Sequence, residues 1–169
     1  MANFTLTTFH IYVMPDLSFD QLLSRAMHLC SRQEKCSSDI LKKLSGWGAD
    51  EEESTRILKK LTEGKFIDDR RYAKAYTRQQ HTLRKWGRIK IRMVLKQKGI
   101  PEAWIDEALE ELDEQEYLQT LREEIQKKRR TLKDKNRYDL LARLQKFAYA
   151  RGYEPALARR VAEEVMNID

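Results

Sequence analysis

The segment Ile67-Asp68-Asp69-Arg70-Arg71-Tyr72 carries the pattern from which the fold of this chain can be predicted. Its first aspartate can accept hydrogen bonds from the free N–H groups at a helix start, and the flanking isoleucine and tyrosine can pack across that start. The same arrangement occurs at Leu17-Ser18-Phe19-Asp20-Gln21-Leu22 and at Leu112-Asp113-Glu114-Gln115-Glu116-Tyr117. The sequence therefore predicts three capped helix starts, spaced about fifty residues apart.

A second series of markers lies at predicted helix ends. Gly48, Gly99 and Gly152 each follow the last apolar residue of a helical pattern, where glycine readily adopts the left-handed conformation. These glycines also lie about fifty residues apart, so two independent markers indicate internal repetition. Apolar spacing then predicts three helices per unit, over residues 18–30, 37–45 and 51–63, then 69–83, 87–98 and 101–111, then 113–130, 135–150 and 155–167.

The predicted fold class is all-α, with three tandem three-helix repeats. The repeats span residues 16–65, 66–111 and 112–169, and residues 1–15 form an N-terminal tail that is either strand-like or disordered. A composition of 41% hydrophobic and 36% charged residues suits helices with narrow apolar stripes and broad solvated faces. The alternative is a single nine-helix globule whose caps are regularly spaced by coincidence.

Residues that would support catalysis are missing from the sequence. It has no glycine-rich phosphate loop, and Cys30 and Cys36 lack the spacing of a metal site. Of the scattered histidines, His28 is expected to be packed and His81 to be exposed. No segment has the length and apolar character of a membrane helix, and the N-terminus does not resemble a secretory signal. We therefore expect a cytoplasmic protein that is not an enzyme and needs no cofactor or metal.

Charge is strongly segregated along the chain, although the net charge is only +6. Residues 102–116 contain eight acidic and no basic residues, and residues 127–137 carry seven basic residues against one acid. Residues 70–98 contain eleven basic residues and no acidic one, namely Arg70, Arg71, Lys74, Arg78, Arg84, Lys85, Arg88, Lys90, Arg92, Lys96 and Lys98. A face with this much like charge suggests a polyanionic partner, although pairing with the acids of residues 102–116 can also neutralise it.

Within this basic run, Arg88, Arg92 and Lys96 recur every four residues and are expected to form a ridge along one helix. Such a ridge can follow a row of phosphates, and its binding would weaken steeply with salt. Trp86 stands at the start of the same helix, where it can either stack on a base or pack between helices. Packing is the favoured interpretation, because large aromatic residues at helix starts usually contribute to a core.

Several of these motifs resemble the signature of the RecX family of regulatory proteins. The resemblance is carried by Phe66-Ile67-Asp68-Asp69-Arg70-Arg71-Tyr72-Ala73, by Trp86-Gly87-Arg88-Ile89-Lys90-Ile91-Arg92 and by Leu95-Lys96-Gln97-Lys98-Gly99-Ile100. A weaker match lies at Phe147-Ala148-Tyr149-Ala150-Arg151-Gly152-Tyr153. The chain departs from the family pattern at Arg88, where a proline is common, and at Cys36, where a serine cap is usual.

The resemblance implies a cytoplasmic protein of tandem three-helix repeats that binds the RecA recombinase filament on single-stranded DNA. It also implies restraint of strand exchange, ATP hydrolysis and coprotease activity, without a cofactor. Together with the charge pattern, it predicts a monomeric, elongated and curved helical array that contacts RecA and single-stranded DNA. The candidate contact residues are the eleven of the basic run with Lys127, Lys128, Arg129 and Arg130. The alternative is a helical-repeat nucleic-acid-binding protein with no recombinase partner.

Overall fold

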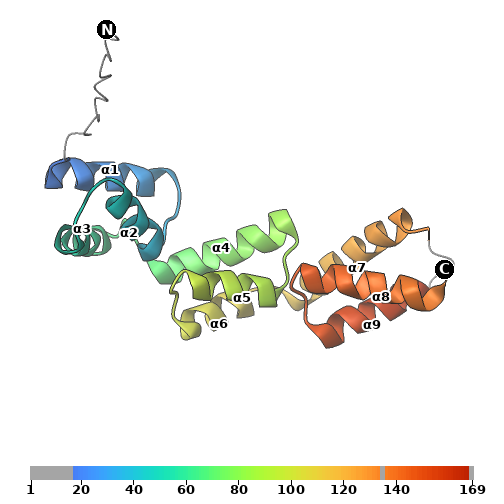
Figure 1. Cartoon of the computed structure of the whole chain (residues 1–169). Coiled ribbons are helices and arrows are strands. Elements are labelled where there is room, and N and C mark those ends of the chain that lie inside the picture. Colours follow the sequence, from blue (N-terminus) through green and yellow to red (C-terminus); the bar gives the residue numbers. More distant parts are fainter. Residues whose placement is uncertain (1–16, 134–135, 168–169) are drawn as a thin grey trace, which may run out of the picture.

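The computed structural model describes residues 17–133 and 136–167, and these residues form helices without any strand. Figure 1 shows the helices gathered into three bundles that lie in an extended row, which bends where α2 meets α4. The predicted tail, residues 1–15, lies outside the described residues. The helices are α1 (Phe19–Arg32), α2 (Ser37–Gly46), α3 (Glu51–Glu63), α4 (Asp69–Arg84), α5 (Arg88–Gln97), α6 (Glu102–Glu110), α7 (Glu114–Thr131), α8 (Arg137–Ala150) and α9 (Pro155–Asn167). The all-α prediction is confirmed.

The three predicted caps are present. Ser18 and Gln21 form a reciprocal capping box at α1, in which the Ser18 N–H donates to Gln21 Oε1 at 2.9 Å. Asp68 accepts from the Arg71 N–H at 2.9 Å, and Asp113 accepts from the Glu116 N–H at 2.8 Å. Each cap satisfies one of the backbone donors that a helix start leaves free, which is why the helix starts could be read from the sequence.

The predicted glycine helix ends are also confirmed. Gly48, Gly99 and Gly152 have φ angles of 92°, 76° and 83°, in the left-handed region that an L side chain rarely adopts. After two of these glycines an apolar residue folds back into a core: Ile100 and Tyr153 are 4% and 1% exposed. This is the apolar contact expected after a left-handed helix end.

Buried apolar side chains form three separate cores. The first contains Ile40 and Ile57, the second Ile91 and Ile105, and the third Leu121. The helix pairs that pack closely, such as α1 with α3, α4 with α6, and α8 with α9, lie within one bundle. This separation favours tandem units over a single globule.

A few residues of one unit are nevertheless buried in the core of the neighbouring unit. Cys36, which precedes α2, is fully buried in the second core, and Ile67, which precedes α4, is buried in the first. Leu112 packs against both the second and the third core. Cys36 occupies the N-cap position of α2 without a side-chain capping bond, because its thiol lies in the core instead.

Candidate partner-binding surface

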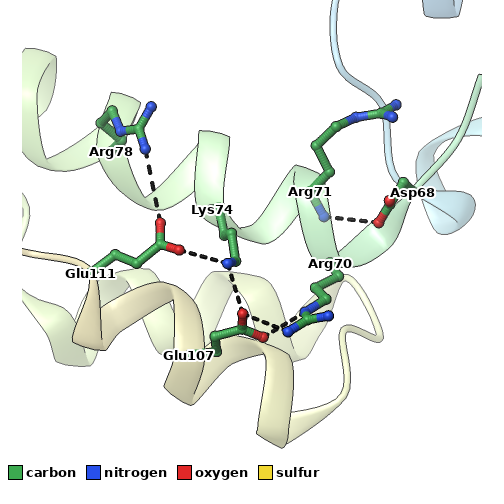
Figure 2. Close-up of polar contacts among 7 residues, drawn as sticks. All are labelled: Asp68, Arg70, Arg71, Lys74, Arg78, Glu107 and Glu111. Carbon is green, nitrogen blue, oxygen red and sulfur yellow. Dashed lines mark hydrogen bonds and ion pairs between the residues drawn. The ribbon is translucent and has the colours of Figure 1, made fainter.

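A ladder of ion pairs joins α4 to α6 (Figure 2). Arg70, Lys74 and Arg78 recur every four residues on α4, and they face Glu107 and Glu111 on α6. The Arg70 guanidinium binds both carboxylate oxygens of Glu107, at 2.6 and 2.7 Å. Lys74 Nζ lies 2.7 Å from Glu107 and 2.6 Å from Glu111, whereas Arg78 is 3.8 Å from Glu111. These cations are therefore turned toward a neighbouring helix.

Because of this ladder, we expect the free energy of unfolding to decrease as the pH becomes acidic. Hydrogen bonds from Arg70, together with those from Lys74, lower the pKa of Glu107 to about 2 from an ordinary value of 4.5. A carboxylate with a depressed pKa stabilises the folded state above its unfolded pKa, and this contribution is lost as the pH falls from 4.5 toward 2. We expect Glu107→Gln to lower the melting temperature by a few degrees at pH 7 and by clearly less at pH 2, where the Glu107 carboxyl is partly protonated in the folded state.

The measurement is thermal unfolding followed by circular dichroism across this pH range. Glu110→Gln is the matched control, because Glu110 is an exposed glutamate on the same helix that forms no ion pair with any residue the structure describes. A difference in melting temperature between wild type and Glu107→Gln that is as large at pH 2 as at pH 7 would show that the ladder does not set this dependence.

The ridge predicted on α5 is also paired with acids. Arg88 binds Glu114 at 2.7 Å and lies 3.7 Å from Glu154. Arg92 binds Glu102, and it also binds Asp106 at 2.6 Å, while Lys96 binds Glu102 at 2.7 Å. The three residues share one side of the helix, as their spacing predicts, but their charges face acids of this chain.

Two further members of the basic run bind acids of the first unit. Arg71 binds Glu34 at 2.7 Å, and Lys98 binds Asp39 at 2.7 Å. Eight of the eleven cations in the run thus have an acidic partner among the described residues, so pairing within the chain neutralises most of it. The three others are Arg84, Lys85 and Lys90.

These three cations surround Trp86 at the turn between α4 and α5. The Arg84 guanidinium lies 5.4 Å from the centre of the Trp86 ring, and Lys90 Nζ lies 4.7 Å from it. Lys85 occupies the left-handed position that ends α4, with a φ angle of 55°. Trp86 itself packs against the second core, so the packing interpretation is confirmed.

Basic residues of the third unit adjoin this turn. The Arg151 guanidinium donates to the carbonyl oxygen of Arg84 at 3.0 Å and lies 4.7 Å from the Phe147 ring. Lys128 Nζ lies 5.9 Å from the same ring. Arg151 therefore connects the two basic segments that were predicted separately. We call Arg84, Lys85, Lys90, Lys128 and Arg151 the cationic surface.

Sequence reasoning did not select Arg151 as a contact residue, although its Arg-Gly-aromatic motif is the signal that could have identified it. Lys127 borders this surface but binds Glu124 at 3.2 Å, and Arg151 binds the same carboxylate at 3.2 Å. Arg129 and Arg130 follow in the last turn of α7. The third-unit candidates thus occupy the C-terminal end of α7, whereas the start of this helix binds the second unit through Glu114 and Arg88.

The junction between the second and third units depends on two glycines. The Gly87 N–H donates to the Arg151 carbonyl at 2.8 Å, and the Ile89 N–H donates to the Gly152 carbonyl at 3.0 Å. A Cβ atom at Gly87 would lie 2.3 Å from the Gly152 oxygen, which is far inside van der Waals contact. Only glycine allows the two backbones to approach this closely.

Tyr117 fixes the same junction from α7. Its hydroxyl oxygen accepts from the Arg88 N–H at 2.9 Å, and its O–H donates to Glu154 at 2.8 Å. Burial raises the pKa of this phenol, so it remains protonated at neutral pH. The ring of His81 stacks on Tyr117 with a centroid distance of 5.1 Å.

Both histidine predictions were wrong. His81 is buried, with 4% exposure, because its ring lies between Tyr117 and the carbonyl of Trp86, which is 3.0 Å from Nδ1. His28 is exposed, since the buried side of α1 is formed by Leu22 and Ala26. A histidine inside a basic run can therefore face the core when the helix carries its cations on other sides.

The described part of the chain contains neither a membrane span nor a metal cluster. None of the described helices has the length and apolar character needed to cross a bilayer. The described residues contain no cluster of three or more histidine, cysteine, aspartate or glutamate side chains arranged to hold a metal ion.

Two segments of the chain match models of known protein families. Residues 68–109 match the model of the RecX second three-helix domain, and residues 114–162 match the model of the RecX third three-helix domain. The first of these segments includes α4, α5 and nearly all of α6, and the second includes the Arg151-Gly152-Tyr153 turn. Both partners of the glycine junction thus lie in matched segments.

Several curated relatives named "Regulatory protein RecX" are similar to the chain. One from Clostridium botulinum (strain Alaska E43 / Type E3) is 30% identical over 146 residues, covering 85% of this chain and 68% of the relative. One from Chlorobaculum tepidum is 36% identical over 110 residues, covering 65% and 67%. One from Clostridium tetani is 31% identical over 130 residues, covering 76% and 59%. The chain spans about three fifths to two thirds of these relatives.

Two solved structures share the architecture. A crystal structure described as regulatory protein RecX aligns with a TM-score of 0.75 at 27% identity, covering 86% of this chain and 73% of the other. RecX from Lactobacillus salivarius aligns with a TM-score of 0.77 at 18% identity, covering 87% and 96%. The second likeness concerns the fold alone.

Proposed function

This chain belongs to the RecX family of regulatory proteins, and we propose that it binds the RecA filament on single-stranded DNA and restrains it. The activities restrained are ATP hydrolysis, strand exchange and coprotease activity. The observation that carries the proposal is the family membership, since the relatives named above are regulatory proteins by name. We place the protein in the cytoplasm, acting as a monomer and without catalysis of its own.

The charge distribution supports a partner that contains nucleic acid. Most of the basic run is paired within the chain, whereas Arg84, Lys85 and Lys90 have no acidic partner among the described residues. They gather at one turn beside Arg151 of the third unit, and Lys128 lies near the Phe147 ring that Arg151 also contacts. Cations that no local acid neutralises are the groups best placed to bind phosphates, and they contribute binding that weakens with salt.

The shape of the array suggests how binding restrains the filament. An extended row of bundles can lie along a helical polymer and contact successive RecA protomers. ATP turnover in such a polymer is coupled to movements between subunits. A ligand that contacts neighbouring subunits at once favours one relative arrangement and opposes those movements.

The decisive experiment follows ATP hydrolysis by RecA filaments assembled on poly(dT) as the protein is added. We expect hydrolysis to fall as the protein saturates the filament. Binding of the protein to labelled poly(dT) alone is measured in parallel by fluorescence anisotropy. Tight binding to bare DNA with unchanged hydrolysis would instead favour a nucleic-acid-binding protein with no recombinase partner. Inhibition with little affinity for bare DNA at low salt would leave RecA as the main contact.

A further inference from the structure

A groove runs along one side of α4, away from the ion-pair ladder. Its volume is about 560 Å³, within the range of clefts that hold ligands or parts of partner proteins. The residues Tyr72, Tyr76, Gln80 and Leu83 recur along the groove at helical spacing. Gln33 and Glu34, which follow α1, line its other side, so the groove lies at the junction of the first and second units.

The floor of the groove is aromatic and apolar. Tyr72 and Tyr76 stack with a centroid distance of 5.6 Å. Leu83, in the last turn of α4, is 71% exposed, which is unusual for a large apolar side chain beside a cleft. An occupant with an apolar group can cover Leu83 and gain the free energy of removing that surface from water.

Two oxygen atoms at the groove have no hydrogen-bond donor. Glu34 Oε1 accepts from Arg71 at 2.7 Å, but Glu34 Oε2 is buried and has no partner among the described residues. Gln80 Oε1 is likewise buried without a donor, and the whole Gln80 residue is 8% exposed. Buried acceptors of this kind are costly, and a partner whose donors meet these oxygens after a side-chain rotation toward the groove removes the cost.

These features determine what kind of occupant fits. At Glu34 and Gln80 a phosphate would add acceptors beside acceptors, so this part of the groove disfavours nucleic acid, whereas Arg84 lies at its end. A lysine or arginine side chain offers several N–H donors and the complementary charge. An apolar neighbour in the same segment would cover Leu83.

We propose that this groove binds a protein segment that presents a lysine or arginine next to an apolar residue. The proposal rests on the function proposed above and adds to it, because it assigns the segment to RecA. Arg84 lines one end of the groove and also belongs to the cationic surface. A RecA filament contains both protein and DNA. A RecA segment can therefore occupy the groove while Arg84 contacts the DNA phosphates.

The test uses the full chain with the double substitution Glu34→Gln and Leu83→Ser. The first change removes the charge but keeps an acceptor for Arg71, and the second removes the exposed apolar group. We expect binding to RecA filaments on poly(dT) to weaken about tenfold or more, in line with the loss of two contacts at an interface. Affinity for poly(dT) alone is expected to stay within about twofold, since neither residue contributes positive charge.

Met93→Ser is the matched control. Met93 is 50% exposed on α5 and does not line the groove, so its loss is expected to leave filament binding unchanged. Circular dichroism and melting temperature establish that each variant is folded. In a second measurement, a benzophenone amino acid at position 83 is irradiated on the filament, and we expect it to attach to a RecA segment containing lysine or arginine.

The outcomes separate the two proposals. If the wild type inhibits the filament and the folded double variant binds as tightly, the groove proposal is overturned while the proposed function stands. Attachment from position 83 to the DNA strand alone also overturns the groove proposal. If the wild type neither binds nor inhibits the filament, both proposals fall together.

Discussion

Replacing Gly87 by alanine is expected to open the junction between the second and third units while leaving both bundles folded. The new Cβ atom would lie 2.3 Å from the Gly152 carbonyl oxygen and 2.4 Å from its carbon, and backbone atoms there have little room to move. The two backbones must move apart to relieve this clash, which breaks the backbone hydrogen bonds from Gly87 to Arg151 and from Ile89 to Gly152. We expect a loss of about 1–3 kcal/mol of junction stability, as for other overpacked sites.

Hydrogen exchange checks this result most directly, because the Ile89 amide should exchange faster when the junction opens. Amides in the first unit should keep their protection. Gly46→Ala is the matched control: Gly46 lies in α2 with no atom within 4 Å of an added Cβ. That variant is expected to be neutral or slightly stabilised, since alanine has the higher helix propensity. Equal exchange at Ile89 in both variants would contradict the proposed tightness of the junction.

The second large effect is expected at the cationic surface. Arg84→Gln, Lys85→Asn and Lys90→Gln together remove the three cations of the basic run that have no acidic partner within residues 17–133 and 136–167. Asparagine suits position 85, because it tolerates the left-handed backbone found there. We expect affinity for single-stranded DNA to fall about tenfold or more near 0.1 M salt, and the slope of log affinity against log salt to flatten by about 2.

The control for this variant removes the same charge from a different place. Arg32, Lys42 and Lys43 are exposed cations of the first unit, and all three are changed to glutamine. Affinity for poly(dT) is measured by fluorescence anisotropy from low to moderate salt. If both triple variants lose affinity equally, binding follows the net charge of the chain and the cationic surface has no special role.

Helix positions were largely predictable from the sequence because caps and helix ends are local. Ser18, Asp68 and Asp113 cap helices through atoms only three residues away, and glycine at a helix end reflects the φ angle of one residue. Such features need no knowledge of the rest of the fold. The helices expected in each unit accordingly agree with those observed to within a few residues.

The distribution of charge was predictable only in part. The sequence showed the basic run and the acidic run, but it left open whether they pair. That choice depends on the packing of α4 against α6, which brings Arg70 to Glu107 across 37 residues of chain. Periodicity identified Arg88, Arg92 and Lys96 as one side of a helix, yet which helix faces that side is a tertiary property.

The role of Gly87 was the least predictable feature. It reads in the sequence as part of a motif before a helix, and its φ angle is not in the glycine-specific region. The need for glycine at this position comes from a tertiary contact, because Gly152, which is distant in the sequence, packs directly against it. His81 was misjudged for the same reason, since the ring of Tyr117 that covers it belongs to the next unit.

The three separate cores also have a mechanical consequence. Bending within a bundle would separate buried apolar side chains, whereas bending between bundles disturbs a small number of backbone bonds and ion pairs such as Lys98 with Asp39. The resistance to deformation is therefore lowest at two places along the chain. We therefore expect slow deformation of the array to concentrate at the two junctions, where it displaces only the side chains that neighbouring units share, such as Cys36 and Leu112.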